Sequence, residues 1–318
     1  MARYIKTYAN TNAIKADLKD DVLVKPYVAY NEELQAVDFN TIEKPIDYSK
    51  MYFTIEALED GDIIWRSYFN WFFYRKNGGN WVTAATSSEQ KNNTISVLAG
   101  DKIEIRGTAD RDNQFSATTC TVNIYGNVNS IRLNDNFTGD TTSVPISGLF
   151  IYNTKIVSAE NLVLPATAMT QDCYMRMFRG CTSLTKAPSI LPATSLSLRC
   201  YKEMFSGCTS LVSAPELPAG VVQDNAYENM FIGCTSLEKA PELLAGTLKS
   251  SAYSGMFSGC TSLNYVKCMI YQYPQSDTSM FTNWLSGVSA TGTFVKRAGV
   301  SWPTGNKGIP SGWTVVEE

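Results

Sequence analysis

The sequence predicts a mainly β chain with short helices, organised as an N-terminal arm and hairpin, a β-sandwich, a repeat solenoid and a C-terminal β cap. Two observations predict this fold. Short segments of alternating apolar and polar residues fill the region before residue 144, and one motif recurs through the second half of the chain. We place the domains at residues 1–45, 46–144, 145–286 and 287–318.

The recurring motif is Met-Phe-x-Gly-Cys-Thr-Ser-Leu. Its copies begin in steps of 27, 26 and 26 residues, at Met177, Met204, Met230 and Met256. Degenerate copies precede and follow them at Leu149-Phe150 and Met280-Phe281. Because one copy cannot cover its own apolar side but stacked copies can, the period predicts a right-handed solenoid with a parallel strand on one side and short helices or turns on the other.

Each copy has a predicted internal order. Tyr201, Met204 and Phe205 stand at positions i, i+3 and i+4, which is one face of a helix, and the next glycine would end that helix. A short strand with inward Leu and Ala follows, and a proline ends it. We expect the phenylalanines of successive copies to lie directly above one another: Phe178, Phe205, Phe231 and Phe257.

The chain has eight cysteines and no histidine. Most of the cysteines share repeat positions, so we expect a buried column of small side chains in place of disulfides or a metal site. These cysteines are Cys181, Cys208, Cys234 and Cys260 at one position, and Cys173 and Cys200 at another. Cys120 and Cys268 have no assigned role. Without histidine, the common hydrolase sites lose their usual residue, and we predict no catalytic residue, metal or cofactor.

Composition and charge exclude two further classes of partner. The formal net charge is −3, so no basic excess is present to neutralise a nucleic acid backbone. No apolar run is long enough to insert into a membrane. Residues 1–21 lack the apolar core of a secretory signal, and we expect none there.

The segment before the repeats alternates apolar and polar residues in short runs separated by turn signals. Six or seven strands within about 100 residues predict an antiparallel β-sandwich of immunoglobulin-like type. The predicted strands are 52–57, 69–74, 81–84, 95–97, 102–106 and 121–125. Residues 22–30 and 34–39 predict a hairpin, which together with residues 1–20 forms an arm too small to fold alone. Strands are also expected at 292–296 and 313–316, in the cap.

The repeat strands offer the best candidate binding surface. If Leu and Ala point inward, the intervening residues form an outward column: Ser158, Lys186, Ser213, Lys239 and Tyr265. A second column near the strand ends contains Ser189, Glu216 and Glu242. These positions vary while the framework is constant, as in scaffolds that present different chemistry, although simple solvation explains any single one of them.

Two other groups are weaker candidates. In the aromatic run 65–74, sandwich core is the ordinary interpretation, but Trp71 or Phe73 would be a contact if one face were exposed. Asp110, Asp112 and Asp135 are typical of solvated turns, although a glycosidase would need two opposed carboxyl groups of this kind.

The repeat residues, together with Ala-Pro-Glu-Leu-Pro-Ala at 214–219, resemble the BspA-like leucine-rich repeats of Bacteroidetes surface proteins. The resemblance covers residues 149–284. The flanking segments 52–61, 122–126 and 308–315 resemble chains that carry these repeats in gut Bacteroides and their phages. The resemblance implies a surface-exposed, non-enzymatic binding role and carries over no catalytic residue.

We expect a Bacteroides phage virion component of fibre or head-decoration type, located on the virion surface. Its N-terminal arm would bind a virion protein, its sandwich would act as a spacer, and its solenoid would recognise a bacterial surface glycan or protein receptor. Anchoring of this kind predicts a homo-oligomer, for example a trimer. The alternatives are a secreted adhesin at the bacterial cell surface, which binds host proteins or glycans, and a carbohydrate-active enzyme.

Overall fold

The computed structural model describes residues 18–19, 22–23, 29–30, 36–37, 46–67, 72–84, 91–108, 114–142, 146–274 and 277–318. The chain divides into two compact units, Met1–Asp47 and Tyr48–Glu318. The described residues are mainly β, as predicted, with one short α-helix, α2 (Ser130–Leu133), and 3-10 turns at Tyr48–Lys50, Asn134–Asn136 and Ser279–Phe281.

The first unit contains two short antiparallel pairs. β1 (Leu18–Lys19) pairs with β2 (Val22–Leu23), and β3 (Ala29–Tyr30) pairs with β4 (Ala36–Val37). The second pair lies within the predicted hairpin; β2 also falls in its first predicted strand but pairs with β1, and the remaining residues of that hairpin are outside the described ones.

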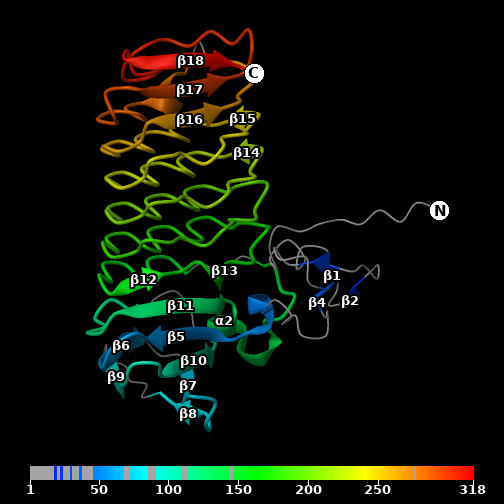
Figure 1. Cartoon of the computed structure of the whole chain (residues 1–318), viewed down its shortest axis with the longest axis vertical. Coiled ribbons are helices and arrows are strands. Elements are labelled where there is room, and N and C mark those ends of the chain that lie inside the picture. Colours follow the sequence, from blue (N-terminus) through cyan, green and yellow to red (C-terminus); the bar gives the residue numbers. More distant parts are fainter. Residues whose placement is uncertain are drawn as a thin grey trace, which may run out of the picture. The chain divides into compact units, whose positions relative to one another are not determined.

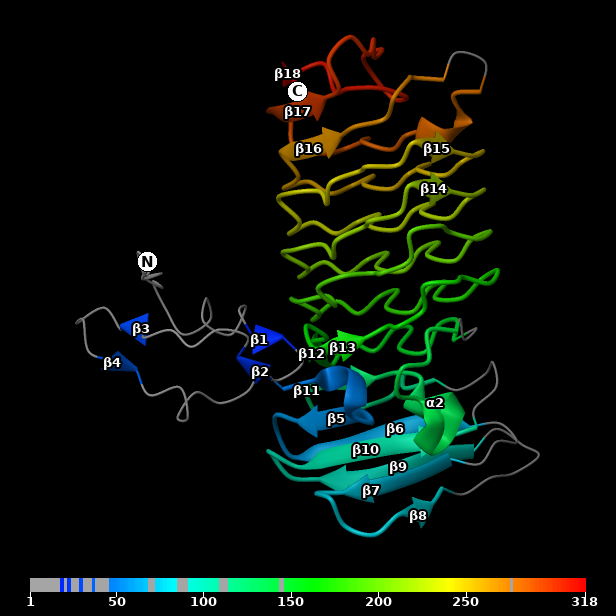
Figure 2. The same ribbon diagram turned by 90° about the vertical axis from the view of Figure 1, so that its right-hand side faces the viewer.

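The second unit begins with two layers of strands (Figure 2). One sheet has the strand order β12-β11-β5-β10-β7-β8, and β6 pairs with β9 in the other layer. Large apolar side chains fill the space between the layers; the rings of Trp65 on β6 and Phe72 on β7 lie 6.4 Å apart. The strands are β5 (Phe53–Ala57), β6 (Gly61–Ser67), β7 (Phe72–Lys76), β8 (Val82–Thr83), β9 (Lys91–Val97), β10 (Lys102–Gly107) and β11 (Val122–Asn127).

Two details differ from the expectation. β6 was not predicted, because Asp60-Gly61-Asp62 is typical of a turn, whereas Gly61 begins a strand that pairs along its length with β9. The strand order is the second difference. β5 lies between β10 and β11, whereas in immunoglobulin domains the last two strands are neighbours.

The repeats, residues 146–274, form a stack of similar turns, called the repeat stack below (Figure 1). Parallel bridges join successive copies along two columns, one from Ser158 to Tyr265 and one from Ala168 to Val221, and the same stacking continues through the last strands. Apart from these bridges, the strands are β12 (Ile156–Ser158), β13 (Leu162–Val163), β14 (Val221–Val222), β15 (Thr247–Leu248), β16 (Tyr265–Cys268), β17 (Gly292–Lys296) and β18 (Trp313–Glu317). β17 and β18 confirm the strands predicted near the C-terminus.

The helices predicted for each copy are absent from the repeat stack. Alternate amides donate to the neighbouring copy: the N–H of Phe178 donates to the carbonyl of Met204 at 2.8 Å, and that of Gly180 to Ser206 at 2.8 Å. In an α-helix these N–H groups would instead donate to carbonyls four residues earlier in the same helix. The backbone is also left-handed at Arg176, with φ of 58°. The copies therefore form turns, although the apolar residues still point inward as the spacing predicted.

Two aromatic columns run through the stack, and the phenylalanine column is as predicted. The ring of Phe205 lies 5.3 Å from that of Phe178 and 5.5 Å from that of Phe231, with interplanar angles of 2° and 4°. Phe231 and Phe257 repeat this geometry at 5.5 Å and 1°. The tyrosines form a parallel column: Tyr174, Tyr201, Tyr227 and Tyr253.

The predicted cysteine column is also present; all eight cysteines are buried, and none of them forms a disulfide. The thiols of Cys181, Cys208, Cys234 and Cys260 each donate a weak hydrogen bond to a phenylalanine carbonyl of an earlier copy, as Cys208 does to Phe178 at 3.1 Å. Burial raises the pKa of Cys260 to about 12. These thiols remain protonated at neutral pH and pack as small apolar groups.

The strand layers at the start of the second unit and the repeat stack share a sheet and a core. β11 pairs in parallel with β12, and the ring of Phe53 lies 5.6 Å from that of Phe150, which stacks on Phe178 at 5.3 Å. At the other end, Trp284 and Trp302 stack at 5.6 Å, and both rings contact Phe294 on β17. Each end of the stack is therefore covered by aromatic side chains, which removes an otherwise exposed apolar surface.

We predict that replacing Phe205 by alanine lowers the free energy of unfolding by about 3–5 kcal/mol, because it removes a ring in the middle of the column and leaves a cavity. Chemical denaturation of the purified chain measures this. As control, Val212→Ala changes a side chain that is 54% exposed and should shift stability by no more than about 0.5 kcal/mol. Equal losses in the free energy of unfolding of the two variants would contradict a stabilising role of the aromatic column.

Candidate functional site

The outward column of the repeat stack has the register that the sequence predicted. Ser158, Lys186, Ser213, Lys239 and Tyr265 are joined one to the next by parallel bridges. Lys186, Ser213 and Lys239 are exposed, and the two end members are half-buried. The flanking leucines Leu211 and Leu237 are fully inaccessible, and the alanines Ala187 and Ala240 are buried, whereas Ala214 is half-buried. The backbone thus holds five different positions at the spacing of neighbouring strands.

Two members of this column have specific partners. The Lys186 ammonium pairs with the Glu160 carboxylate at 2.7 Å, and both side chains are exposed. The Lys239 ammonium lies 4.9 Å from the centre of the Tyr265 ring. Pairs of this kind at the surface are weak, so a ligand with a competing anionic or hydroxyl group can displace them at small cost.

The second column follows the strand ends with one correction. Glu216 lies opposite Ile190, where the sequence placed Ser189, because the first step of the repeat is one residue longer than the others. Glu216 and Glu242 are both exposed and line one cleft of about 440 Å³ with Leu244. The Lys267 ammonium lies 3.5 Å from the Glu242 carboxylate.

A second cleft, of about 390 Å³, is lined by Tyr48, Glu160, Ser189 and Ile190 among others. Sequence reasoning missed the apolar members of both clefts, Ile190 and Leu244, which are 42% and 48% exposed. The signal for Leu244 was present: it stands where the other copies have the proline of Leu-Pro-Ala. An exposed leucine in place of a proline marks a position that the core does not require.

The aromatic candidates do not form an open platform in the described residues. Trp71 lies outside those residues. Phe73 is half-buried on β7, and the Arg106 guanidinium lies 5.5 Å from the centre of its ring. Arg106 also lies 4.2 Å from the centre of the Trp81 ring, so this face of the sheet is occupied by its own side chains.

The structure describes only one of the three carboxylate candidates, Asp135. Asp110 and Asp112 lie outside the described residues. Asp135 is paired with Arg106 and accepts a hydrogen bond from the Tyr52 hydroxyl at 2.7 Å. These two interactions hold the pKa of Asp135 below its ordinary value. Asp135 therefore has a structural role, because its carboxylate is held by Arg106 and Tyr52.

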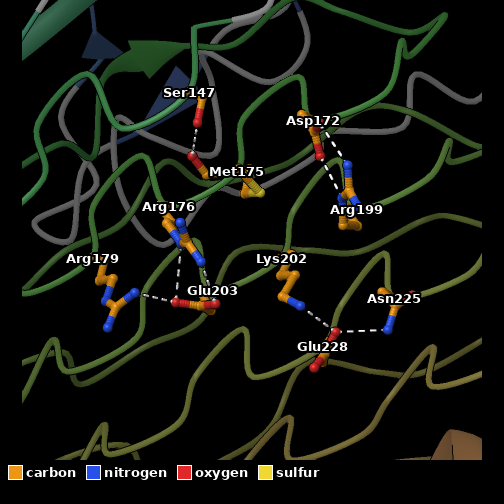
Figure 3. A network of polar contacts seen from close by, with 10 residues as sticks. All are labelled: Ser147, Asp172, Met175, Arg176, Arg179, Arg199, Lys202, Glu203, Asn225 and Glu228. Carbon is orange, nitrogen blue, oxygen red and sulfur yellow. Dashed lines mark hydrogen bonds and ion pairs between the residues drawn. The ribbon is translucent and has the colours of Figure 1, made fainter.

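A network of charged residues joins successive copies on the turns of the stack (Figure 3). Glu203 accepts from Arg176 of the preceding copy at 3.1 and 3.2 Å, and pairs with Arg179 of that copy. Asp172 pairs with Arg199 at 2.8 Å, and Lys202 with Glu228 at 2.7 Å. Every carboxylate in this network pairs with a cation from a neighbouring copy. The network therefore holds successive copies of the stack together.

The protonation of Glu203 follows from these contacts. Burial by itself raises the pKa of this carboxyl, but the hydrogen bonds from Arg176 and the charges of both arginines outweigh it, and the pKa lies below its ordinary value. The pair therefore stabilises the fold above the unfolded pKa of about 4.3, and this stabilisation is lost as the pH falls through the lower folded value.

We predict that Glu203→Gln lowers the free energy of unfolding by about 1–3 kcal/mol at pH 7, because two cations lose their partner. The difference from the unaltered chain should shrink below about pH 4, where the carboxyl becomes protonated. Urea denaturation at several pH values measures both effects. Glu160→Gln, in an exposed pair, should cost no more than about 1 kcal/mol; a pH-independent deficit in Glu203→Gln would contradict the assignment.

The candidate site is therefore an open face with two columns and two clefts, which offers amines, carboxylates, hydroxyls and apolar side chains for contact. No group of His, Cys, Asp and Glu suited to a metal ion occurs in the part of the chain that the structure describes. Over the same residues, no helix has the length and apolar character to cross a membrane. No family model matches the chain, and neither a curated protein nor a solved structure matches it.

Proposed function

We propose that this chain is a non-enzymatic binding protein, in which a leucine-rich repeat solenoid of BspA type follows an immunoglobulin-like β-sandwich and presents its outer strand face to a partner. The resemblance of the repeat motif supports the family. The parallel bridges and aromatic columns support the solenoid, and the two layers of strands support a sandwich with an altered strand order.

One observation carries the proposal. The interior positions repeat from copy to copy, with Phe, Tyr, Cys and Leu in register, while the outward column changes at each step from Ser to Lys to Ser to Lys to Tyr. A constant interior with a variable, exposed column is the property of repeat scaffolds whose outer surface recognises other molecules. Solvation alone would not require Tyr265 or Leu244 on this face.

The chemistry of the face favours a partner rich in hydroxyl and anionic groups. The amines of Lys186 and Lys239 suit carboxylates or sulfates, and the serine hydroxyls and carboxylates suit sugar hydroxyl groups. A bacterial surface glycan, or a protein receptor that carries one, has these groups. The virion surface, the anchoring of the N-terminal arm to a virion protein and a homo-oligomer such as a trimer are proposed on the resemblance alone.

We predict that the labelled full chain binds intact Bacteroides cells, and that the double change Lys186→Glu and Lys239→Glu lowers binding about tenfold or more, because two contacts across one face become repulsive. Flow cytometry over a concentration series measures the affinity. The matched control reverses two exposed lysines elsewhere, Lys102→Glu with Lys307→Glu, and should retain binding. Equal losses in the two double variants would contradict recognition by the repeat face.

A further inference from the structure

The last strand of the second unit has an unoccupied edge. β18 pairs in parallel with β17 along one side, and within the described ranges no strand pairs with its other side. Thr314, Val315, Val316 and Glu317 are all exposed, with Val315 at 45% and Val316 at 40%. Both views place β18 at the end of the stack (Figures 1 and 2). Five residues of strand with two exposed valines form an edge suited to pairing with another strand.

The free main-chain groups on this edge can be identified from the pairing. Glu318 donates its N–H to Lys296 at 3.0 Å and accepts from Ala298 at 2.8 Å, so its main-chain groups face β17. Main-chain groups alternate in direction along a strand, and those of Thr314 and Val316 therefore also face β17. The N–H and C=O groups of Val315 and Glu317 therefore point away from β17, toward the open edge of the sheet.

We propose that this edge binds the β18 edge of a second copy of the chain, as an antiparallel pair with a two-fold axis at Val316. In this register Val315 of each copy lies opposite Glu317 of the other, and these residues exchange four main-chain hydrogen bonds. Val316 faces its own counterpart across the axis. Thr314 faces Glu318, so no like charges are opposed.

The other two-fold registers are worse for reasons that the structure shows. An axis at Glu317 would place two Glu317 carboxylates directly opposite each other, which is destabilising. An axis at Val315 would pair Glu317 with Trp313, whose N–H already donates to Pro310 at 3.1 Å. Within the chain, Glu317 pairs with Lys296, and Glu318 pairs with Lys267 at 2.8 Å, so the acidic end of β18 is neutralised by its own sheet.

The pairing would have a consequence for recognition. Residues opposite each other in an antiparallel pair project from the same side of the sheet, so the outer faces of both copies would lie on one side of a continuous sheet. The two outward columns, each ending at Tyr265 on β16, would then be presented together. Two linked faces raise the apparent affinity for a partner that repeats its binding groups, without any new contact.

The test is sedimentation velocity on the full chain over about 1–500 µM, a range suited to a small interface. The unaltered chain should show a reversible doubling of the mass of its smallest species. Val316→Lys opposes two lysines across the axis and should weaken this association about tenfold or more, whereas Val315→Lys places each lysine opposite a glutamate and should strengthen it about threefold or more.

Val82→Lys is the matched control, because Val82 is a similarly exposed valine on the edge strand β8, and it should leave the association unchanged. Circular dichroism melting of each variant reports whether it is folded. Three results would overturn the proposal: no doubling of mass in the unaltered chain, equal weakening by Val315→Lys and Val316→Lys, or an association that Val316→Lys does not change.

Discussion

The structure depends on one constraint, that each copy of the repeat must be followed by another at the spacing of neighbouring strands. The constraint acts through three kinds of contact at once. Rings stack on identical rings, cysteine thiols donate to carbonyls of an earlier copy, and alternate amides donate to the next copy in place of their own turn. A copy without a neighbour would leave all three unsatisfied, together with its apolar surface, and this is the physical origin of the regular stack.

The same constraint explains which parts of the fold could be predicted. The phenylalanine and cysteine columns and the outward column follow from period and polarity, because residues separated by one period must lie in register. The strands β17 and β18 lie outside the repeats and were predicted from the Gly-rich turns around them. Period and polarity do not decide whether each copy contains a helix. Spacing at i, i+3 and i+4 places Tyr201, Met204 and Phe205 on one side, but it cannot tell whether the amides between them bond within the copy or to the next one.

The candidate site divides along a similar line. The outward column was predictable, because Leu and Ala fix which positions point inward. The clefts were not, because they depend on local departures from the repeat: Leu244 replaces a proline, and the extra residue in the first step brings Ile190 opposite Glu216. Strand β6 was not predicted for a related reason. Gly61 resembles a turn residue, but a glycine is required there because Cys120 lies close to its Cα. A Cβ at Gly61 would lie 2.7 Å from the Cβ of Cys120.

Similar interiors would allow a copy to stack out of register on a copy that is not its neighbour in the chain, and the charges on the turns oppose this. Arg176 lies at the position that Glu203 has in the next copy, and Arg179, three residues further on, pairs with the same carboxylate; Lys202 lies at the position that Glu228 has in the following copy. A displaced copy would keep its aromatic contacts but lose its charge partners, and would leave Glu203 buried without a cation. Loss of a partner for a buried charge costs more than an exposed pair contributes, so the network distinguishes the native order from a slipped one. The order of copies in turn fixes the order of side chains in the outward column, and with it the chemistry of the proposed binding face.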